Sequence, residues 1–239
     1  MVEMQAYDVA VVGLGAMGSA ALYAAARRGL RVIGFDRLEP GHNRSSSFGE
    51  SRVIRLAYFE HPSYVPLLRG AYRAWRDLEV ATGERVLAIT GIVEAGHPGA
   101  ALVEGSVRSA REHDLPHELL SPRQVNDRFP AFNLPADWDC VAQPDGGVLL
   151  SEKAIGLFVA AAQDLGASVR LNTPVREVQP LGDRVTIRVG RRHGDRGGVG
   201  RGRARSVDSR LCAGAGQAPE ANASAASLVQ PGGRRSRAP

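Results

Sequence analysis

Apolar and polar positions near the N-terminus form three successive runs. Residues 7–12 (YDVAVV) are a short β-branched run ending at Gly13, which is typical of a buried strand. Residues 16–28 are rich in Ala, include Leu22 and Tyr23, and are followed by a glycine, which predicts a helix with a glycine cap. Residues 31–35 are a second apolar run, ending at Asp36. This order predicts a βαβ unit with parallel strands.

Helical and strand patterns continue to alternate along the chain. An apolar face recurs at helical spacing at Tyr64, Leu68, Tyr72, Trp75 and Leu78. Further helices are expected at 98–113, from Ser121-Pro122 and at 151–165, and strands at 86–94, 168–171, 175–179 and 184–189. The last two strands are expected to form a hairpin. The fold class is therefore α/β.

The charge of the chain is divided unevenly along its length. The 239 residues have a formal charge of +5, but residues 191–239 hold 10 of the 30 basic and 3 of the 25 acidic residues. This tail therefore carries +7, and residues 1–190 carry −2. The tail also lacks Phe, Tyr, Trp, Ile and Met, so it has little apolar surface to offset the entropy lost on folding. We expect it to be largely disordered.

Neither a membrane segment nor a signal peptide is indicated. No window approaches the roughly 18 consecutive apolar residues of a membrane span, and Glu3 and Asp8 are acidic where a signal peptide is positive. The two cysteines, Cys140 and Cys212, have no CxxC spacing, so we expect no disulfide framework and no metal site. These features predict a cytoplasmic protein with no membrane partner.

A glycine-rich turn joins the first strand to the first helix. Gly13, Gly15 and Gly18 match G-x-G-x-x-G, with Ala16 and Met17 inside the motif. The first glycine permits a tight turn, the second lets a pyrophosphate approach the backbone, and the third lets the helix pack closely on the strand. Free N–H groups at the helix N-terminus attract the phosphates. The motif predicts a dinucleotide site and leaves FAD and NAD open.

The end of the second strand carries the matching acidic residue. Asp36 lies where a carboxylate can accept hydrogen bonds from the ribose hydroxyls of an adenosine. A 2′-phosphate would meet a like charge there, which argues against NADP, although the adjacent Arg37 weakens that argument.

The segment after Asp36 separates FAD from NAD. Residues 41–58 (GHNRSSSFGESRVIRLAY) contain a His, a Ser run, Gly-x-Ser-Arg, a second Arg three positions on, and Ala-Tyr. This order resembles the sarcosine oxidase and N-methyl-tryptophan oxidase family, which uses FAD. The matching residues are Ser46, Gly49, Arg52, Arg55, Ala57, Tyr58 and Glu60. With residues 64–67 and 144–149, the resemblance covers about residues 7–189.

The resemblance implies both an architecture and an activity. It implies a Rossmann-type FAD-binding domain at residues 1–92 and 145–190, part of a substrate domain at 93–144, and an off-pattern tail at 191–239. It also implies an enzyme that oxidises the C–N bond of a secondary amine or N-methyl amino acid with oxygen and gives hydrogen peroxide. The expected partners are a small amine substrate and oxygen.

The resemblance also assigns roles to individual residues. Arg55 matches the arginine that holds the substrate carboxylate, a task suited to a planar and permanently charged donor. Arg52 matches an arginine lying over the flavin ring, and Glu60 is expected to orient Arg55 through an ion pair. Ser46 and Ser47 are expected to hydrogen-bond the cofactor near its isoalloxazine end. Main-chain groups of Val175 are expected to meet the adenine.

Two positions depart from the family pattern. Ser47-Phe48 stand where the family commonly has a histidine pair. Neither Cys140 nor Cys212 matches the cysteine to which several members attach the flavin, so covalent attachment is not implied.

The chain also departs from the pattern in its length and its tail. It ends at about half of a family member's length. After Val189 the family has a further apolar strand ending in Ala-Gly-x-Trp, but residues 191–210 are too Arg-rich for a buried strand. Only residues 211–216 (LCAGAG) resemble that motif, without its Trp. A change of reading frame near Gly190 in a GC-rich coding sequence is one hypothesis, which translation of the neighbouring genomic frames can test.

Two other functions compete with the flavoenzyme. An NADP-dependent β-hydroxyacid dehydrogenase has an opening similar to residues 13–18, but such enzymes usually place Asn-Arg at 36–37 and lack the Arg52/Arg55 segment. The Arg-Gly repeats at 196–203 resemble RGG-type nucleic-acid binders. No aromatic residue is interleaved there to stack on bases, so we expect no specific nucleic-acid partner.

Overall fold

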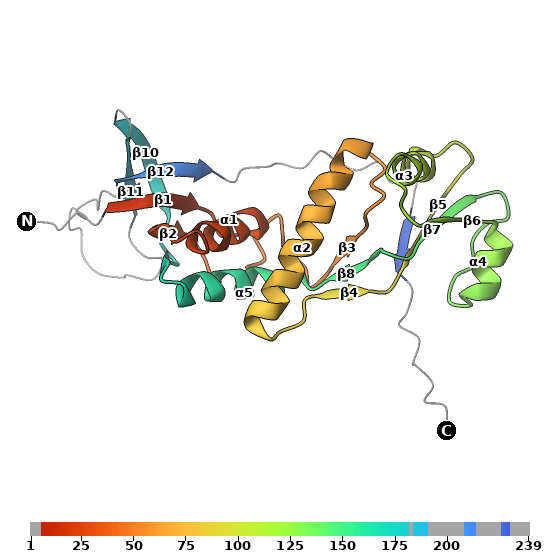
Figure 1. Ribbon diagram of the computed structural model, residues 1–239, viewed down its shortest axis with the longest axis horizontal. Coiled ribbons are helices and arrows are strands. Elements are labelled where there is room, and N and C mark those ends of the chain that lie inside the picture. The colour runs from red at the N-terminus through yellow and green to blue at the C-terminus, as the bar shows by residue number, and fades with distance from the viewer. Residues whose placement is uncertain (1–5, 182–183, 191–207, 214–225, 230–239) are drawn as a thin grey trace, which may run out of the picture. The chain divides into compact units, whose positions relative to one another are not determined.

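The computed structural model describes residues 6–181, 184–190, 208–213 and 226–229 (Figure 1). These residues fall into two compact units: unit 1 lies within residues 1–50 and 151–218, and unit 2 within 51–150 and 219–239. The domain boundaries that the family resemblance implies, at 92/93 and 144/145, differ from the boundaries of these units. The difference arises because residues 51–92 and 145–150 contribute strands to a small sheet of unit 2.

Unit 1 is built on a six-stranded sheet. Its strands follow the order β10-β11-β12-β1-β2-β9. Their bounds are β1 (Ala6–Val12), β2 (Val32–Phe35), β9 (Ser168–Arg170), β10 (Val175–Leu181), β11 (Arg184–Val189) and β12 (Asp208–Ala213). Strands β12, β1, β2 and β9 run parallel, whereas β10 and β11 form the expected antiparallel hairpin. The predicted α/β class and the βαβ unit are therefore confirmed.

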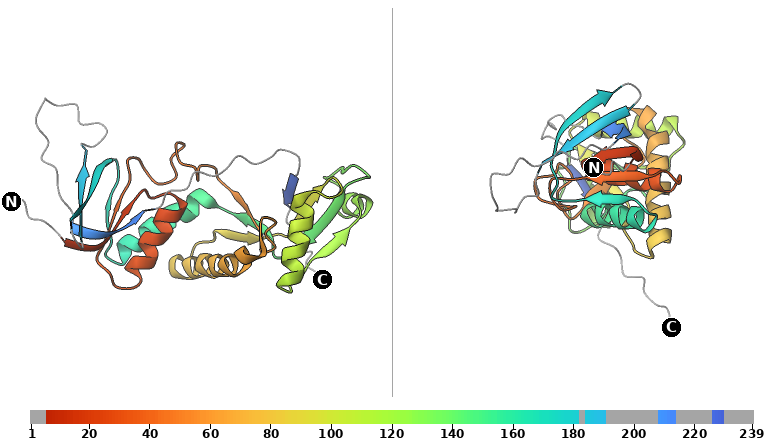
Figure 2. Two further views of the ribbon diagram at one scale, coloured as in Figure 1. Left: turned by 90° about the horizontal axis from the view of Figure 1, so that it is seen from above. Right: turned by 90° about the vertical axis from the view of Figure 1, so that its left-hand side faces the viewer.

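Helices α1 (Ala16–Ala26) and α5 (Ser151–Asp164) lie side by side in unit 1 (Figure 2). The rings of Tyr23 and Phe158 join them, with centroids 5.6 Å apart. Leu22 of α1 and Ala162 of α5 are fully buried. The apolar faces read from the sequence thus form the helical layer of this unit.

Strand β12 corrects the expectation for the tail. It lies in the tail predicted to be largely disordered, beginning in the stretch 191–210 judged too Arg-rich for a buried strand and ending in residues 211–216, which resemble the family motif. It nevertheless lies between β1 and β11. Its apolar end pairs with β1, as in Ala10↔Leu211 and Val12↔Ala213. Backbone pairing on both sides needs no aromatic or β-branched side chain, which is why composition failed to indicate it. Apart from β12 and β13, the tail lies outside the described residues.

Unit 2 contains two smaller sheets. A four-stranded sheet has the order β13-β5-β7-β6, and a three-stranded sheet has the order β3-β8-β4. Their bounds are β3 (Arg52–Ile54), β4 (Leu87–Ile89), β5 (Ile92–Gly96), β6 (Glu118–Leu120), β7 (Asp139–Gln143), β8 (Gly147–Leu149) and β13 (Ala226–Val229). The helical elements are η1 (Pro62–Tyr64), α2 (Val65–Thr82), α3 (Ala101–Glu112) and α4 (Pro122–Arg128).

The single strand expected at 86–94 is two strands in the structure. Strands β4 and β5 are separated at Gly91, which has a positive φ of 76°. The backbone N–H groups of Thr90 and Gly91 both donate to the carbonyl of Gly146. The left-handed turn available to glycine therefore redirects the chain from one sheet to the other. None of the helices in the described part of the chain combines the length and apolar character needed to span a bilayer.

Glu79 connects the last turn of α2 to the start of β4. Its Oε1 accepts hydrogen bonds from the backbone N–H groups of Val86 and Leu87, both at 2.8 Å, and its Oε2 lies 2.7 Å from Nη1 of Arg76. Burial alone raises the pKa of Glu79, but these hydrogen bonds outweigh it and hold the pKa below its ordinary value of 4.5.

We expect Glu79 to stabilise the fold only where its carboxylate is ionised. Because its folded pKa is lowered, this stabilisation is present above the unfolded value and is lost as the pH falls through the folded value. Glu79→Gln should therefore cost stability at pH 7 and progressively less as the pH falls below 4.5, as measured by urea unfolding. Asp127→Asn, which alters an exposed contact with Arg123, is the control. A cost for Glu79→Gln that does not depend on pH would contradict this.

Candidate functional site

The glycine-rich turn has the form that the motif predicts. Gly13 follows β1 with a φ of 89°, which favours glycine. A Cβ on Gly18 would lie 1.7 Å from the carbonyl oxygen of Gly13, so close helix packing also requires glycine there. A Cβ on Gly15 would instead meet the Ser45 and Ser47 hydroxyls at 3.5 and 3.6 Å, which is ordinary contact. The protein's own packing therefore does not require glycine at position 15.

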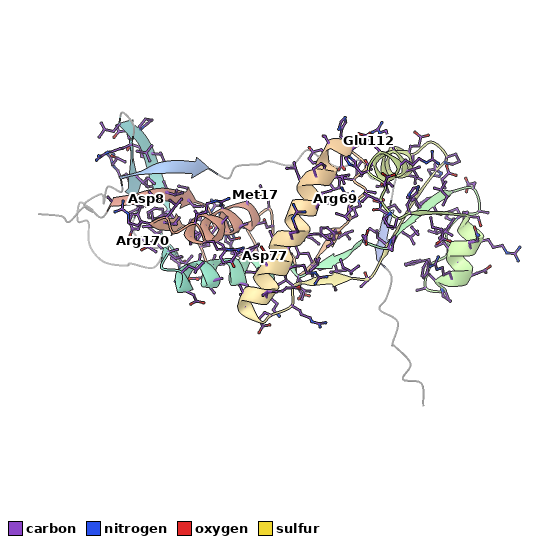
Figure 3. The ribbon with its side chains drawn as sticks, viewed as in Figure 1. Asp8, Met17, Arg69, Asp77, Glu112 and Arg170 are labelled. Carbon is purple, nitrogen blue, oxygen red and sulfur yellow. The ribbon has the colours of Figure 1, made fainter. Side chains whose placement is uncertain are left out.

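Gly15 is the N-cap of α1, and no side chain of its own caps the helix. The backbone N–H of Ala16 donates to the Ser47 hydroxyl at 3.2 Å. Met17, in the same first turn, is 78% exposed (Figure 3). The start of α1 therefore presents the N–H groups of its first turn beyond that of Ala16, and the Ser47 hydroxyl, which can donate to a phosphate oxygen. A pyrophosphate uses such donors at a helix N-terminus.

Asp36 ties the end of β2 to the glycine-rich turn. Its side chain is buried, its Oδ2 accepts from the backbone N–H of Leu14 at 2.7 Å, and its Oδ1 accepts from that of Leu38 at 2.9 Å. The Nε2 atom of His42 lies 3.7 Å from Oδ1. A carboxylate has about four lone-pair sites, so acceptor capacity remains for a ribose hydroxyl.

The serine-rich segment is held in unit 1 by the first turn of α5. The backbone N–H of Gly49 donates to Oε1 of Glu152 at 2.9 Å, and the Ser151 hydroxyl donates to the Gly49 carbonyl at 2.6 Å. Within the segment, the backbone N–H of Ser47 donates to the Ser45 hydroxyl. These contacts bring Ser47, which is predicted to bind the cofactor, next to the start of α1.

The remaining predicted cofactor residues are less closely grouped. Arg37 and Ser46 are exposed, and Ala16 is exposed at the start of α1. Val175 begins strand β10 at the edge of the sheet, where its half-buried side chain packs against the cluster around Phe35 and Ile187. The structure thus gathers Gly13, Gly15, Gly18, Asp36 and Ser47 around one turn.

These residues fit FAD by the chemistry of their donors and acceptors. A dinucleotide needs open backbone N–H groups for its pyrophosphate and a carboxylate for its ribose. The first turn of α1 supplies the former and Asp36 the latter.

The predicted catalytic arginines belong to unit 2. Arg52 begins β3 and is exposed, and its Nη1 donates to the carbonyl of Ser51 at 2.8 Å. Arg55 follows the same strand with a side chain only 12% exposed. Its guanidinium carbon lies 4.8 Å from the ring centroid of Tyr58 and 5.3 Å from that of Phe59. The guanidinium therefore lies within cation–π distance of two aromatic rings.

The ion-pair partner of Arg55 is Glu94. Its Oε1 lies 2.8 Å from Nε of Arg55, and its side chain is fully buried. The expected partner, Glu60, is exposed instead. Glu94, rather than Glu60, is the partner because strand β5 places the Glu94 side chain in the interior, beside Arg55. Neither Nε nor Oε1 has a partner with hydrogen-bond geometry among the described residues, so the contact is purely ionic.

A buried polar network fixes the other oxygen of Glu94. Its Oε2 accepts from the Ser106 hydroxyl and from Nε2 of Gln143, both at 2.6 Å. The Gln143 amide also holds the backbone of Ala57, accepting from its N–H at 3.0 Å and donating to its carbonyl at 3.2 Å. Burial raises the pKa of Glu94, against the lowering effects of Arg55 and of these hydrogen bonds.

The sequence did not indicate Glu94, Ser106 or Gln143 as site residues. A signal was present, because Glu94 is a single charge inside the apolar run 92–96 (IVEAG), and a buried charge requires a partner. The partner itself is not visible in the sequence, since Arg55 and Gln143 are joined to it only by the folding of β5 and β7. Cys140, in β7, is a buried free thiol whose pKa is raised by burial.

Comparisons with known proteins agree with this geometry. Residues 8–232 match the family described as FAD dependent oxidoreductase (DAO). The match therefore extends into the region beyond 190, where the sequence departed from the expected pattern. FAD, rather than NAD or NADP, is thus the dinucleotide, and the dehydrogenase alternative is not favoured.

Two curated relatives are similar over most of the chain. The monomeric sarcosine oxidase of Streptomyces avermitilis is 39% identical over 181 residues, which are 76% of this chain and 47% of that protein. The N-methyl-L-tryptophan oxidase of Yersinia pestis is 35% identical over 173 residues, 72% of this chain and 47% of that protein. The chain therefore spans about half the length of these relatives.

Solved structures show the same fold. The open form of NikD, described as an unusual amino acid oxidase essential for nikkomycin biosynthesis, has a TM-score of 0.73 at 25% identity, covering 89% of this chain and 52% of that one. Glycine oxidase from Geobacillus kaustophilus, at 22% identity and a TM-score of 0.64, supports the fold alone. The chain belongs to the DAO family of FAD-dependent oxidoreductases.

Proposed function

We propose that this chain is the FAD-binding and carboxylate-recognising part of an oxidase that acts on the C–N bond of an N-methyl amino acid or similar secondary amine. The observation that carries the proposal is the joint presence of the open helix N-terminus at Gly15 with Asp36, and of the buried Arg55. Similarity to sarcosine and N-methyl-L-tryptophan oxidases supports the substrate class. Oxygen is the proposed electron acceptor and hydrogen peroxide the product.

The roles of the residues follow from their chemistry. The N–H groups of the first turn of α1 bind the pyrophosphate, and Asp36 accepts from the ribose. Ser46, Ser47, Arg37 and the main chain at Val175 line the rest of the cofactor. Bound FAD supplies the two-electron acceptor for the amine. Arg52 provides positive charge toward the flavin, and Arg55 orients the substrate by its carboxylate.

Flavin uptake by the purified full chain tests the proposal. We expect the chain, mixed with FAD and freed of excess cofactor by gel filtration, to retain a flavin absorption band. Peroxide production from N-methylglycine would then extend the proposal from binding to turnover. Retention of NADP together with failure to retain flavin would reject it.

A further inference from the structure

Arg55 differs from a free carboxylate receptor because it already has a carboxylate beside it. Glu94 is fully buried and lies 2.8 Å from Nε of Arg55. It cannot easily turn away, because Ser106 and Gln143 hold its second oxygen. The charge of the arginine is therefore balanced before any ligand arrives.

The terminal edge of the guanidinium is the part that remains for a ligand. The Oε1 atom of Glu94 lies nearest Nε, and the rings of Tyr58 and Phe59 lie within 4.8 and 5.3 Å of the guanidinium carbon. The printed contact with Glu94 is made at Nε and not at the terminal nitrogens Nη1 and Nη2. These two nitrogens form the fork that binds a carboxylate through parallel hydrogen bonds.

The charge balance then decides which ligands are favoured. A simple carboxylate added to the neutral Arg55–Glu94 pair leaves one net negative charge in a poorly solvated place, and this is unfavourable. A zwitterion brings a compensating ammonium together with its carboxylate. We propose that Glu94 makes the Arg55 site selective for net-neutral, zwitterionic amino acids over simple carboxylate anions. This inference rests on the proposed role of Arg55 in binding the substrate carboxylate.

Glu94→Gln provides the test, because glutamine keeps the size and an acceptor oxygen while removing the charge. Thermal unfolding of the full chain would be followed against increasing acetate, an anion, or trimethylglycine, a zwitterion without an oxidisable amine. Sodium chloride keeps the ionic strength constant, and the shift in midpoint gives each Kd. We expect the wild type to bind trimethylglycine more tightly than acetate. In Glu94→Gln acetate should bind about tenfold more tightly, the order of effect of one nearby charge inside a protein.

Three comparisons make the outcome decisive. Glu104→Gln, an exposed carboxylate of α3, should leave both affinities unchanged. Acetate affinity that is unchanged or lower in Glu94→Gln would overturn the role of Glu94. If Glu94→Gln does not fold, the two Kd values of the wild type test the proposal. Acetate binding as tight as trimethylglycine binding would overturn it.

The double variant Arg55→Met/Glu94→Gln separates this inference from the proposed function. It removes both charges together and so avoids leaving Glu94 buried without a counter-ion. We expect it to lose stabilisation by either ligand. If it binds acetate as tightly as Glu94→Gln does, Arg55 is not the carboxylate receptor, and the proposed role of Arg55 fails whatever Glu94 does.

Discussion

Gly18→Val should abolish both flavin retention and the cooperative unfolding of unit 1. Even a Cβ at this position would lie 1.7 Å from the carbonyl oxygen and 2.9 Å from the carbonyl carbon of Gly13. Both contacts are with backbone, so no side-chain rotation can relieve them, and α1 must move away from β1. Such overpacking typically costs about 1–3 kcal/mol for modest insertions, and a backbone clash this close is expected to exceed that range. Flavin absorbance after gel filtration and circular dichroism on heating measure the two effects.

A glycine in the other helix of unit 1 is the matched control. Gly156 lies in α5, and a Cβ there would meet nothing within 4 Å. Gly156→Ala should therefore stabilise the protein by up to about 1 kcal/mol through helix propensity and leave flavin retention unchanged. Normal flavin retention by Gly18→Val would show that α1 does not pack on the glycine-rich turn as described.

Asp36→Asn should weaken FAD binding at least about tenfold, the effect of losing one charge-assisted hydrogen bond. The carboxylate accepts from the N–H groups of Leu14 and Leu38 with different oxygens. An asparagine has one oxygen and one NH₂ group, so one of these donors must face another donor. This mismatch should also cost about 1–3 kcal/mol of stability. Flavin titration and urea unfolding measure the two losses.

Asp8→Asn is the control for this substitution. Asp8 also lies in β1 but is partly exposed, and its side chain binds the backbone N–H and guanidinium of Arg31 away from the turn (Figure 3). We expect its loss to leave the FAD affinity unchanged. If Asp36→Asn weakens FAD no more than Asp8→Asn does, Asp36 is not a cofactor residue.

The parts of unit 1 that could be predicted from the sequence are those whose pattern lies within a short stretch of consecutive residues. β1, α1 and β2 follow one another within a short stretch, and each is marked by its own apolar period and by glycines. The contact between Gly18 and Gly13 is likewise contained in the spacing of the motif. Asp36 was also predictable, because the strand before it ends at a fixed distance from the glycines.

The environment of Arg55 could not be predicted in the same way. The sequence next to Arg55 contains Glu60, and a local interpretation pairs the two. The structure pairs Arg55 with Glu94, whose position depends on the register of β5 with β7, in which Glu94 stands opposite Val141. Register between strands is set by turns and packing far from either residue. The site chemistry of unit 2 therefore depends on tertiary contacts that no local pattern specifies.

The central place of β12 has a consequence for how the chain acquires its structure. Strand β1 is among the first segments to be synthesised, yet one of its two neighbours comes from residues 208–213, as in the pairing of Ala10 with Leu211. Closing so long a loop is slow compared with forming hairpins or helices. During synthesis one edge of β1 has no strand partner until β12 has been made. An unpaired strand edge can pair with other chains and so promotes aggregation. The strand order of this sheet therefore makes the completion of β1's pairing depend on a segment that is synthesised about 200 residues later.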